Sequence, residues 1–234
     1  MDSDESLRGD MTRCEVVDTS AMKWAPSPSP SVFRKRLHLV GGAESGQVTS
    51  VVRYVPDSRF HEHDHPEGEE IFVLEGVFSD HRGDHGLGSY LLNPEGHRHA
   101  PWSRPGCVIF VKLRQYSGDG REYVEVDSES LAWQPGDHDG VEEKLLYADP
   151  RFPDATRLER WSPGAAPGER RHPGGAELFV IEGALVDENG RHGTGSWLRL
   201  PPGAKYSSRS DEGAIVYLKM GGVASLRAQP EKSV

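Results

Sequence analysis

The sequence has little cysteine. Its two cysteines are Cys14, in a polar N-terminal stretch, and Cys107, in an apolar run. Two thiols cannot supply a scaffold of several disulfides, nor a zinc site built from several thiolates. A scarcity of cysteine favours a reducing compartment, so we predict a cytoplasmic protein.

Long apolar runs and an excess of positive charge are also missing. No apolar run approaches the length of about 20 residues that a membrane-spanning helix needs. The N-terminus lacks the basic region followed by an apolar one that marks a secretory signal. Lys and Arg number 27 against 37 Asp and Glu, a formal net charge of −10. A surface of that sign repels phosphate, so we predict neither a membrane nor a nucleic acid as a partner.

A sustained helical period is absent as well. Short apolar runs, rich in β-branched and aromatic residues, alternate instead with clusters of Gly, Pro and Asp. This pattern predicts an all-β fold of many short strands, as in a sandwich or a barrel. Residues 1–20 are acidic and polar, which predicts a disordered tail. The clearest expected strands are 48–55, 71–74, 89–92, 108–113, 178–181 and 215–220.

The chain contains an internal repeat. Residues 53–113 align without a gap with residues 160–220, and 23 of the 61 pairs are identical. Upstream, Trp24 matches Trp133 at a spacing of 109. A unit of roughly 100 residues is a whole small domain and is too long for a solenoid repeat. We therefore predict two tandem domains, 21–128 and 129–225, flanked by tails at 1–20 and 226–234.

The first copy of the repeat carries four donors at metal-ligand spacing. His63 and His65 are two residues apart, so their imidazoles share one face of a strand. A tight turn follows, Glu69 opens the next strand, and the sheet must bring in His99. Three imidazoles and a carboxylate suit Fe(II), Mn(II), Ni(II), Zn(II) or Cu(II). We predict one divalent metal ion per chain, bound by His63, His65, Glu69 and His99.

The second copy has lost most of these donors. The four positions become Arg170, His172, Ala176 and Tyr206. An arginine beside the site repels a cation, so we predict no metal in the second domain. Arg170 and its neighbour Arg171 could hold an anion in the second domain, but we interpret them as part of a solvated rim.

Other acidic and histidine residues are interpreted as bystanders or scaffold. His85 matches His192 in the copy without a metal site, so both are read as structural, as is Glu70. His61 is expected at the mouth of the site and His97 on the surface.

The donors lie within a longer motif that resembles the two-part motif of cupins. The run 70–80 together with 89–91 is similar to the subgroup of the ChrR anti-sigma factors, which also holds dioxygenases that cleave β-diketones or hydroxyacetophenones. Two features depart from the cupin pattern: the leading glycine is absent, and the trailing asparagine is not at its usual place. The motif here is His63-x-His65-x(3)-Glu69-x(6)-Gly76, then Gly88-x(5)-Pro94-x-Gly96-x(2)-His99.

This resemblance implies two tandem double-stranded β-helix (jelly-roll) cupin barrels, with the metal in the first. Four protein ligands leave two positions open on an octahedral ion, for a small-molecule substrate and dioxygen. The resemblance implies an Fe(II)-dependent dioxygenase acting on a diketone or hydroxyketone.

Two other functions stay open. One is a non-catalytic sensor that binds zinc or a ligand, and the other is a metal-dependent isomerase or lyase. Iron and zinc are the two ions most expected. Residues 1–20 are too few for the sigma-binding domain of ChrR proteins, so we expect no direct control of a sigma factor. Cupins commonly dimerise, so a homodimer also stays open.

Overall fold

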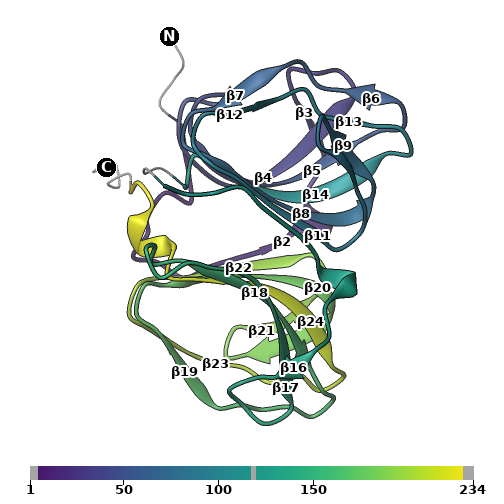
Figure 1. The fold of residues 1–234 in the computed structure, drawn as a ribbon. Coiled ribbons are helices and arrows are strands. Elements are labelled where there is room, and N and C mark those ends of the chain that lie inside the picture. Colours follow the sequence, from purple (N-terminus) through teal and green to yellow (C-terminus); the bar gives the residue numbers. More distant parts are fainter. Residues whose placement is uncertain (1–4, 117–119, 229–234) are drawn as a thin grey trace. The chain divides into compact units, whose positions relative to one another are not determined.

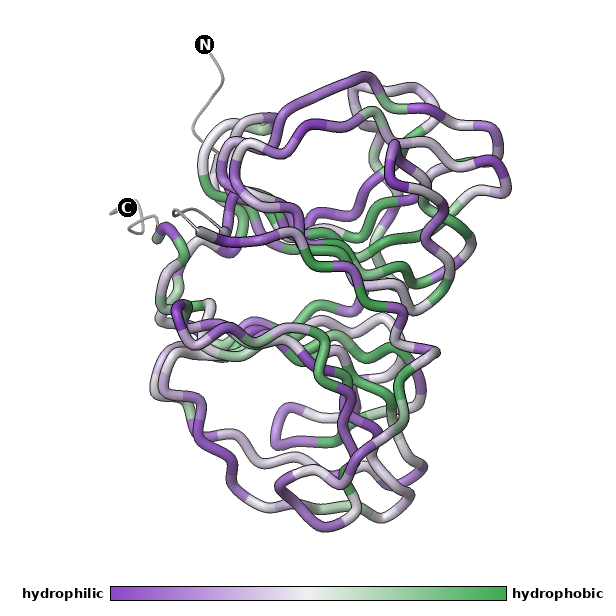
Figure 2. Tube along the Cα trace, in the orientation of Figure 1, coloured by the Kyte–Doolittle hydropathy of each residue, from purple (hydrophilic) through white to green (hydrophobic). Residues whose placement is uncertain are grey.

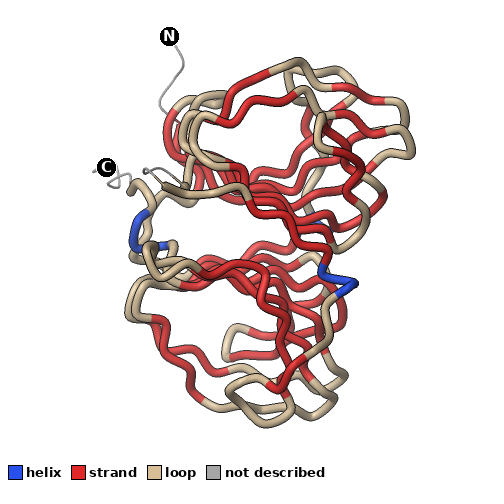
Figure 3. Tube along the Cα trace, viewed as in Figure 1, coloured by secondary structure: helices blue, strands red, loops and turns tan. Residues whose placement is uncertain are grey.

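A computed structural model describes residues 5–116 and 120–228 of the chain. In this part the elements are β-strands and three short 3-10 helices, which confirms the predicted all-β fold (Figure 1, Figure 3). The chain divides into two compact units. Unit 1 comprises residues 1–9 and 23–130, and unit 2 comprises 10–22 and 131–234.

Unit 1 is a jelly-roll barrel of antiparallel strands. Its larger sheet has the order β1-β4-β5-β14-β8-β11-β15, with β3 also paired to β4. A second sheet has the order β10-β9-β13-β6, and β7 pairs separately with β12. The elements of unit 1 are β1 (Glu5–Leu7), β3 (Ala25–Pro26), β4 (Val32–Gly41), β5 (Gln47–Tyr54), β6 (Ser58–Arg59), β7 (His63–His65), β8 (Glu69–Gly76), β9 (Phe78–Asp80), β10 (Gly83–His85), β11 (Ser89–Asn93), β12 (His97–His99), β13 (Trp102–Ser103), β14 (Cys107–Leu113), β15 (Val124–Asp127) and η2 (Ser128–Ser130).

Unit 2 has the same architecture. Its larger sheet has the order β16-β17-β18-β24-β20-β22-β2, with β21 on β20, and β19 pairs with β23 as β7 does with β12. Its elements are β2 (Glu15–Asp18), η1 (Thr19–Ala21), β16 (Gln134–Pro135), β17 (Val141–Ala148), β18 (Ala155–Trp161), β19 (Glu169–His172), β20 (Ala176–Asp187), β21 (Gly190–Gly193), β22 (Ser196–Leu200), β23 (Ala204–Ser207), β24 (Ala214–Met220) and η3 (Val223–Ser225).

The repeated residues occupy equivalent places in the two units. Gly76 and Gly183 both have left-handed backbone, with φ of 72° and 69°. A Cβ added at either would lie 2.0 Å from the carbonyl oxygen of Gly106 or Gly213, respectively. Only glycine fits there, which agrees with a structural reading of this repeated position.

The N-terminal segment is not a disordered tail within its described part, so that prediction is wrong for residues 5–20. β1 pairs with β4, and β2 pairs with β22. Val17 of β2 is buried while the residues on either side of it are exposed. An edge strand needs only one apolar face, so its composition stays polar and resembles that of a disordered segment.

The predicted start of the first domain at residue 21 differs from the structure for the same reason, whereas the predicted division at 128/129 lies within two residues of the observed one at 130/131. β2 stands 109 residues before β15, so the repeat begins earlier than residue 21. β2 completes the sheet of unit 2, whereas its sequence counterpart β15 pairs with β11 in unit 1. The first strand of each repeat is therefore exchanged, which alignment of the two copies alone does not reveal.

Each unit has its own apolar core, formed by alternate residues of the larger sheet (Figure 2). Burial of such side chains contributes about 1.5–3 kcal/mol each. Cys14 and Cys107 are both free. No helix among the described residues is long and apolar enough to cross a membrane. The core of unit 1 comprises Val32, Tyr54, Ile71, Val73, Phe78, Leu91, Cys107, Ile109 and Val111.

Candidate metal centre

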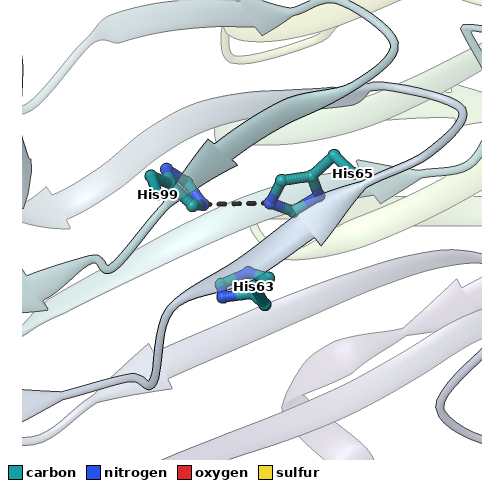
Figure 4. Close-up of side chains that lie close together, drawn as sticks. All are labelled: His63, His65 and His99. Carbon is teal, nitrogen blue, oxygen red and sulfur yellow. Dashed lines mark hydrogen bonds between the residues drawn. The ribbon is translucent and has the colours of Figure 1, made fainter.

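The β7–β12 ribbon gathers the three predicted imidazoles. His63 lies opposite His99 in the antiparallel register, and His65 is two residues further along β7. Opposite residues and residues two apart share one face of a ribbon. His63, His65 and His99 consequently each place a ring nitrogen within 4.8 Å of the other two (Figure 4). His65 and His99 are buried, and His63 is partly buried.

Hydrogen bonds leave the inner nitrogen of two of these rings available. Nδ1 of His63 is 2.7 Å from the carbonyl oxygen of His61, and Nδ1 of His99 is 3.3 Å from a carboxylate oxygen of Asp80. Both oxygens only accept, so each Nδ1 carries a proton, and in the neutral ring each Nε2 keeps its lone pair. Nε2 of His99 then faces Nε2 of His65 at 3.0 Å (Figure 4).

Glu69 supplies the carboxylate next to these rings. Its Oε2 lies 3.4 Å from Nε2 of His65 and 3.6 Å from Nε2 of His99. Asn93 lies opposite Glu69 across the β8–β11 pair and donates a hydrogen bond to the same oxygen at 2.9 Å. The carboxylate is thus fixed in place by a neighbouring strand.

These donors fit one cation of ordinary size. Two ligands about 2.1 Å from an ion are about 3.0 Å apart at a right angle and about 3.4 Å apart at a tetrahedral angle. The separations among His65, His99 and Glu69 fall at or close to these values. The structure therefore brings together all four predicted ligands, including His63.

The protonation states of the site favour the binding of a cation. Burial lowers the pKa of His65 to about 4, assisted by His99 and His63, so the ring is neutral at pH 7. Burial by itself would raise the pKa of Glu69, but the charges of His65 and His99 and the bond from Asn93 lower it below its usual range. A buried carboxylate held ionised beside the neutral ring of His65 attracts a cation.

Asp80 contacts His99 at the ring nitrogen that does not face Glu69 and also contacts His85. One carboxylate oxygen contacts Nδ1 of His99 at 3.3 Å, and the other contacts Nε2 of His85 at 3.4 Å. Burial lowers the pKa of His99, but Glu69 and Asp80 outweigh it and the pKa is raised. Asp187 and His192 form the same pair in unit 2, at 2.8 Å, which agrees with a structural role for both histidines.

Asp80→Asn should weaken metal binding by about 10–100-fold, because ligand imidazoles depend on the group that fixes their tautomer. The measurement is competition with a chelator of known affinity. Asp84→Asn, in the next strand on the exposed side, is the control. Equal affinities for the two variants would contradict the role given to Asp80.

The sequence predicted His97 on the surface, but its side chain is partly buried in the structure. It shares the inner face of β12 with His99, is only partly exposed, and stacks on His65 with ring centroids 6.3 Å apart. With Asp80 and His81 it forms a second trio of side chains whose donor atoms lie within 4.8 Å of one another. His61 is exposed, as expected for a residue at the mouth.

The ligand ribbon borders a cavity of about 430 Å³ inside unit 1. Strands β5 and β14 contribute its apolar wall, including Val48, Val52 and Val111. Phe60 also lines it and packs edge-on against His63, with centroids 5.0 Å apart. A small organic molecule in this space would reach two of the candidate ligands, His63 and His65.

Unit 2 has an internal ion pair where unit 1 has the candidate metal site. Nη1 of Arg170, at the position of His63, lies 2.9 Å from both carboxylate oxygens of Glu159. Glu159 stands at the position of Val52 and also pairs with Arg157, at 2.7 Å. Arg170 is buried, so its interpretation as part of a solvated rim is wrong, whereas Arg171 is 72% exposed.

Asp80, Asn93 and Glu159 were not singled out from the sequence. Asn93 and Glu159 had a usable signal, since the repeat aligns them with Leu200 and Val52 and so changes their polarity. Asp80 had none, because it is identical in both copies and its contact with His99 depends on the fold.

The chain folds into two jelly-roll barrels of antiparallel strands, which are formed by the two copies of one repeat. In the first barrel, three imidazoles and a carboxylate converge. These features define a two-domain cupin. The profile of the ChrR cupin-like domain matches the chain twice, over residues 12–117 and 121–224. The chain belongs to this family. The match begins ahead of β2, in agreement with the repeat boundary seen in the structure.

Solved structures of low sequence identity share the fold. A candidate dioxygenase from Nostoc punctiforme is 18% identical with a TM-score of 0.73, over 96% of this chain and 89% of that one. A candidate glyoxylate-induced protein from Pseudomonas aeruginosa is 13% identical with a TM-score of 0.71, over 99% and 95%. A variant of oxalate decarboxylase from Bacillus subtilis is 13% identical with a TM-score of 0.61, over 88% and 76%. No curated protein matches the chain.

Proposed function

We propose that unit 1 binds one divalent metal ion through His63, His65, Glu69 and His99, and that the chain is a metal-dependent oxidoreductase. The reaction we favour is an Fe(II)-type dioxygenation of a small oxygenated organic compound. The observation that carries the proposal is the convergence of three imidazoles and an ionised carboxylate at separations that fit one ion. Unit 2 serves as scaffold in this proposal.

The cavity favours catalysis over a purely structural ion. Structural metal sites are closed by protein ligands, whereas catalytic sites keep a position open. A space of about 430 Å³ beside His63 and His65 is within the range of small-molecule sites. The fold shared with a candidate dioxygenase and with oxalate decarboxylase supports chemistry on small oxygenated compounds.

The roles of the protein's own residues follow from the contacts. Asp80 holds His99 in the tautomer that presents Nε2, and Asn93 orients Glu69. The apolar wall with Phe60 limits the water that reaches the site. Bound iron would supply the redox chemistry and the open coordination positions for substrate and dioxygen.

Metal analysis and oxygen uptake test this proposal together. Protein purified without added metal should contain about one equivalent of a divalent ion per chain. After loading with Fe(II), it should consume dioxygen with pentane-2,4-dione or a hydroxyketone, and the zinc-loaded form should not. A chain that retains zinc and takes up no oxygen with any such compound would favour the sensor, and a chain that binds no metal would contradict the site itself.

A further inference from the structure

The cavity of unit 1 is lined by arginine, although the chain as a whole is acidic. Arg34, Arg36 and Arg114 border it together with Glu44. Asp64 borders it too, but this side chain is 66% exposed and lies 3.5 Å from Arg98 outside the cavity. Three arginines and one glutamate therefore line this part of the cavity, before any metal ion is counted.

Glu44 is shared by two of these arginines. Arg34 donates to it from both terminal nitrogens, once at 2.9 Å, and Arg36 donates to it at 3.1 Å. Glu44 lies on the turn between β4 and β5 and is 47% exposed, whereas the guanidinium-bearing side chains are 19% and 22% exposed. The one carboxylate that balances part of the charge of this pair is thus on a solvent-facing turn.

Arg114 adds a positive charge that nothing in the described part of the chain balances. It is half-buried, and its guanidinium has no ion pair or hydrogen bond to the residues of that part. Its backbone is left-handed, with φ of 60°. The equivalent residue of unit 2 is Gly221, with φ of 81°, the residue type that adopts this conformation without strain.

The three arginines, like the candidate metal ligands, occur in the first copy of the repeat and are replaced in the second. Arg34 and Arg36 correspond to Glu143 and Leu145 in unit 2, at the spacing of 109 that holds in this region. With Arg114 replaced by glycine, unit 2 lacks all three. Cationic residues that occur only in the barrel with the four donors belong with the chemistry rather than with the scaffold.

We propose that the substrate of unit 1 is a small organic carboxylate, bound by Arg114 together with the Arg34–Arg36 pair, and that Glu44 occupies this pair until the substrate displaces it. This inference rests on the proposed function, because it names the substrate class of the same site. Guanidinium groups bind carboxylates through charge-assisted, often bidentate hydrogen bonds. A cavity with a bound cation and excess arginine attracts anions selectively.

Calorimetric titration of the zinc-loaded protein tests the inference with two matched pairs of compounds. Lactate is compared with acetoin, and mandelate with 1-hydroxy-1-phenylpropan-2-one. Within each pair the hydroxyl group is kept, and a carboxylate is replaced by an uncharged methyl ketone. We expect the acid of at least one pair to bind more tightly than its ketone.

Two variants should change this preference in opposite directions. Arg114→Gln should weaken binding of the acid by about 10-fold or more, and Glu44→Gln should strengthen it several-fold, with the ketone unchanged in both. Arg98→Gln, an exposed arginine outside the cavity, is the matched control. The carboxylate's own affinity for the metal is common to all four proteins and cancels in the comparison.

The inference is overturned if neither acid binds at millimolar concentration, or if Arg114→Gln changes acid and ketone binding alike. The titration reads binding and not turnover, so absence of oxygen uptake does not count against it. Repeating it on metal-free protein separates the two proposals. A charge preference that persists there, and that Arg114→Gln removes, supports the arginine site even if the metal assignment fails.

Discussion

His65→Ala is expected to lower the affinity of the chain for a divalent cation at least about 100-fold. Its Nε2 faces Nε2 of His99 at 3.0 Å and Oε2 of Glu69 at 3.4 Å, so its removal opens one side of the donor set. Loss of a group that merely orients a ligand costs about 10–100-fold, and loss of the ligand itself must cost more. The measurement is metal content after dialysis, with chelator competition for the constant.

The repeat offers a matched control for this experiment. His172→Ala removes the same side chain at the same place in unit 2, where Arg170 and Glu159 neutralise each other nearby. Its metal content should equal that of the unaltered protein. If His172→Ala emptied the protein of metal and His65→Ala did not, the two units would have exchanged roles.

Much of the fold was predictable because each short strand has a strong local signal. Residues 108–113 and 89–92, expected from apolar runs between turns, are β14 and β11 with one residue added to each. The convergence of the four candidate ligands was predictable as well. Strand periodicity places His63 and His65 on one face, and the repeat marks which donors the scaffold does not require.

What could not be predicted depends on partners far away in the sequence. β2 looks disordered because its apolar face forms only against β22. His97 looks like a surface residue until the ribbon places it opposite His65. Arg170 looks solvated until Glu159, on another strand, is found beside it. In each case the local sequence predicts contact with water for a side chain that the tertiary structure buries wholly or in part.

Glu159→Gln is expected to destabilise unit 2 by about 3–5 kcal/mol. The side chains of Glu159 and Arg170 are 1% and 5% exposed, and that of Arg157 on the other side is 13% exposed. Burial by itself would raise the pKa of Glu159, but Arg170 and Arg157 lower it, so the carboxylate is ionised in the folded chain. An amide in its place leaves the buried guanidinium of Arg170 without a compensating charge, whereas Arg157 keeps its ion pair with Glu143 at 2.8 Å.

The corresponding fall in melting temperature, followed by calorimetry, should exceed about 10 °C for a unit of this size. Glu142→Gln is the control, because its ion pair with Arg160 is about 40% exposed and contributes at most about 1 kcal/mol. The double variant Glu159→Val with Arg170→His installs the residues of unit 1 and should recover part of the loss, since replacing a buried pair costs less than breaking it. If Glu159→Gln melted no earlier than Glu142→Gln, the buried ion pair would not stabilise unit 2.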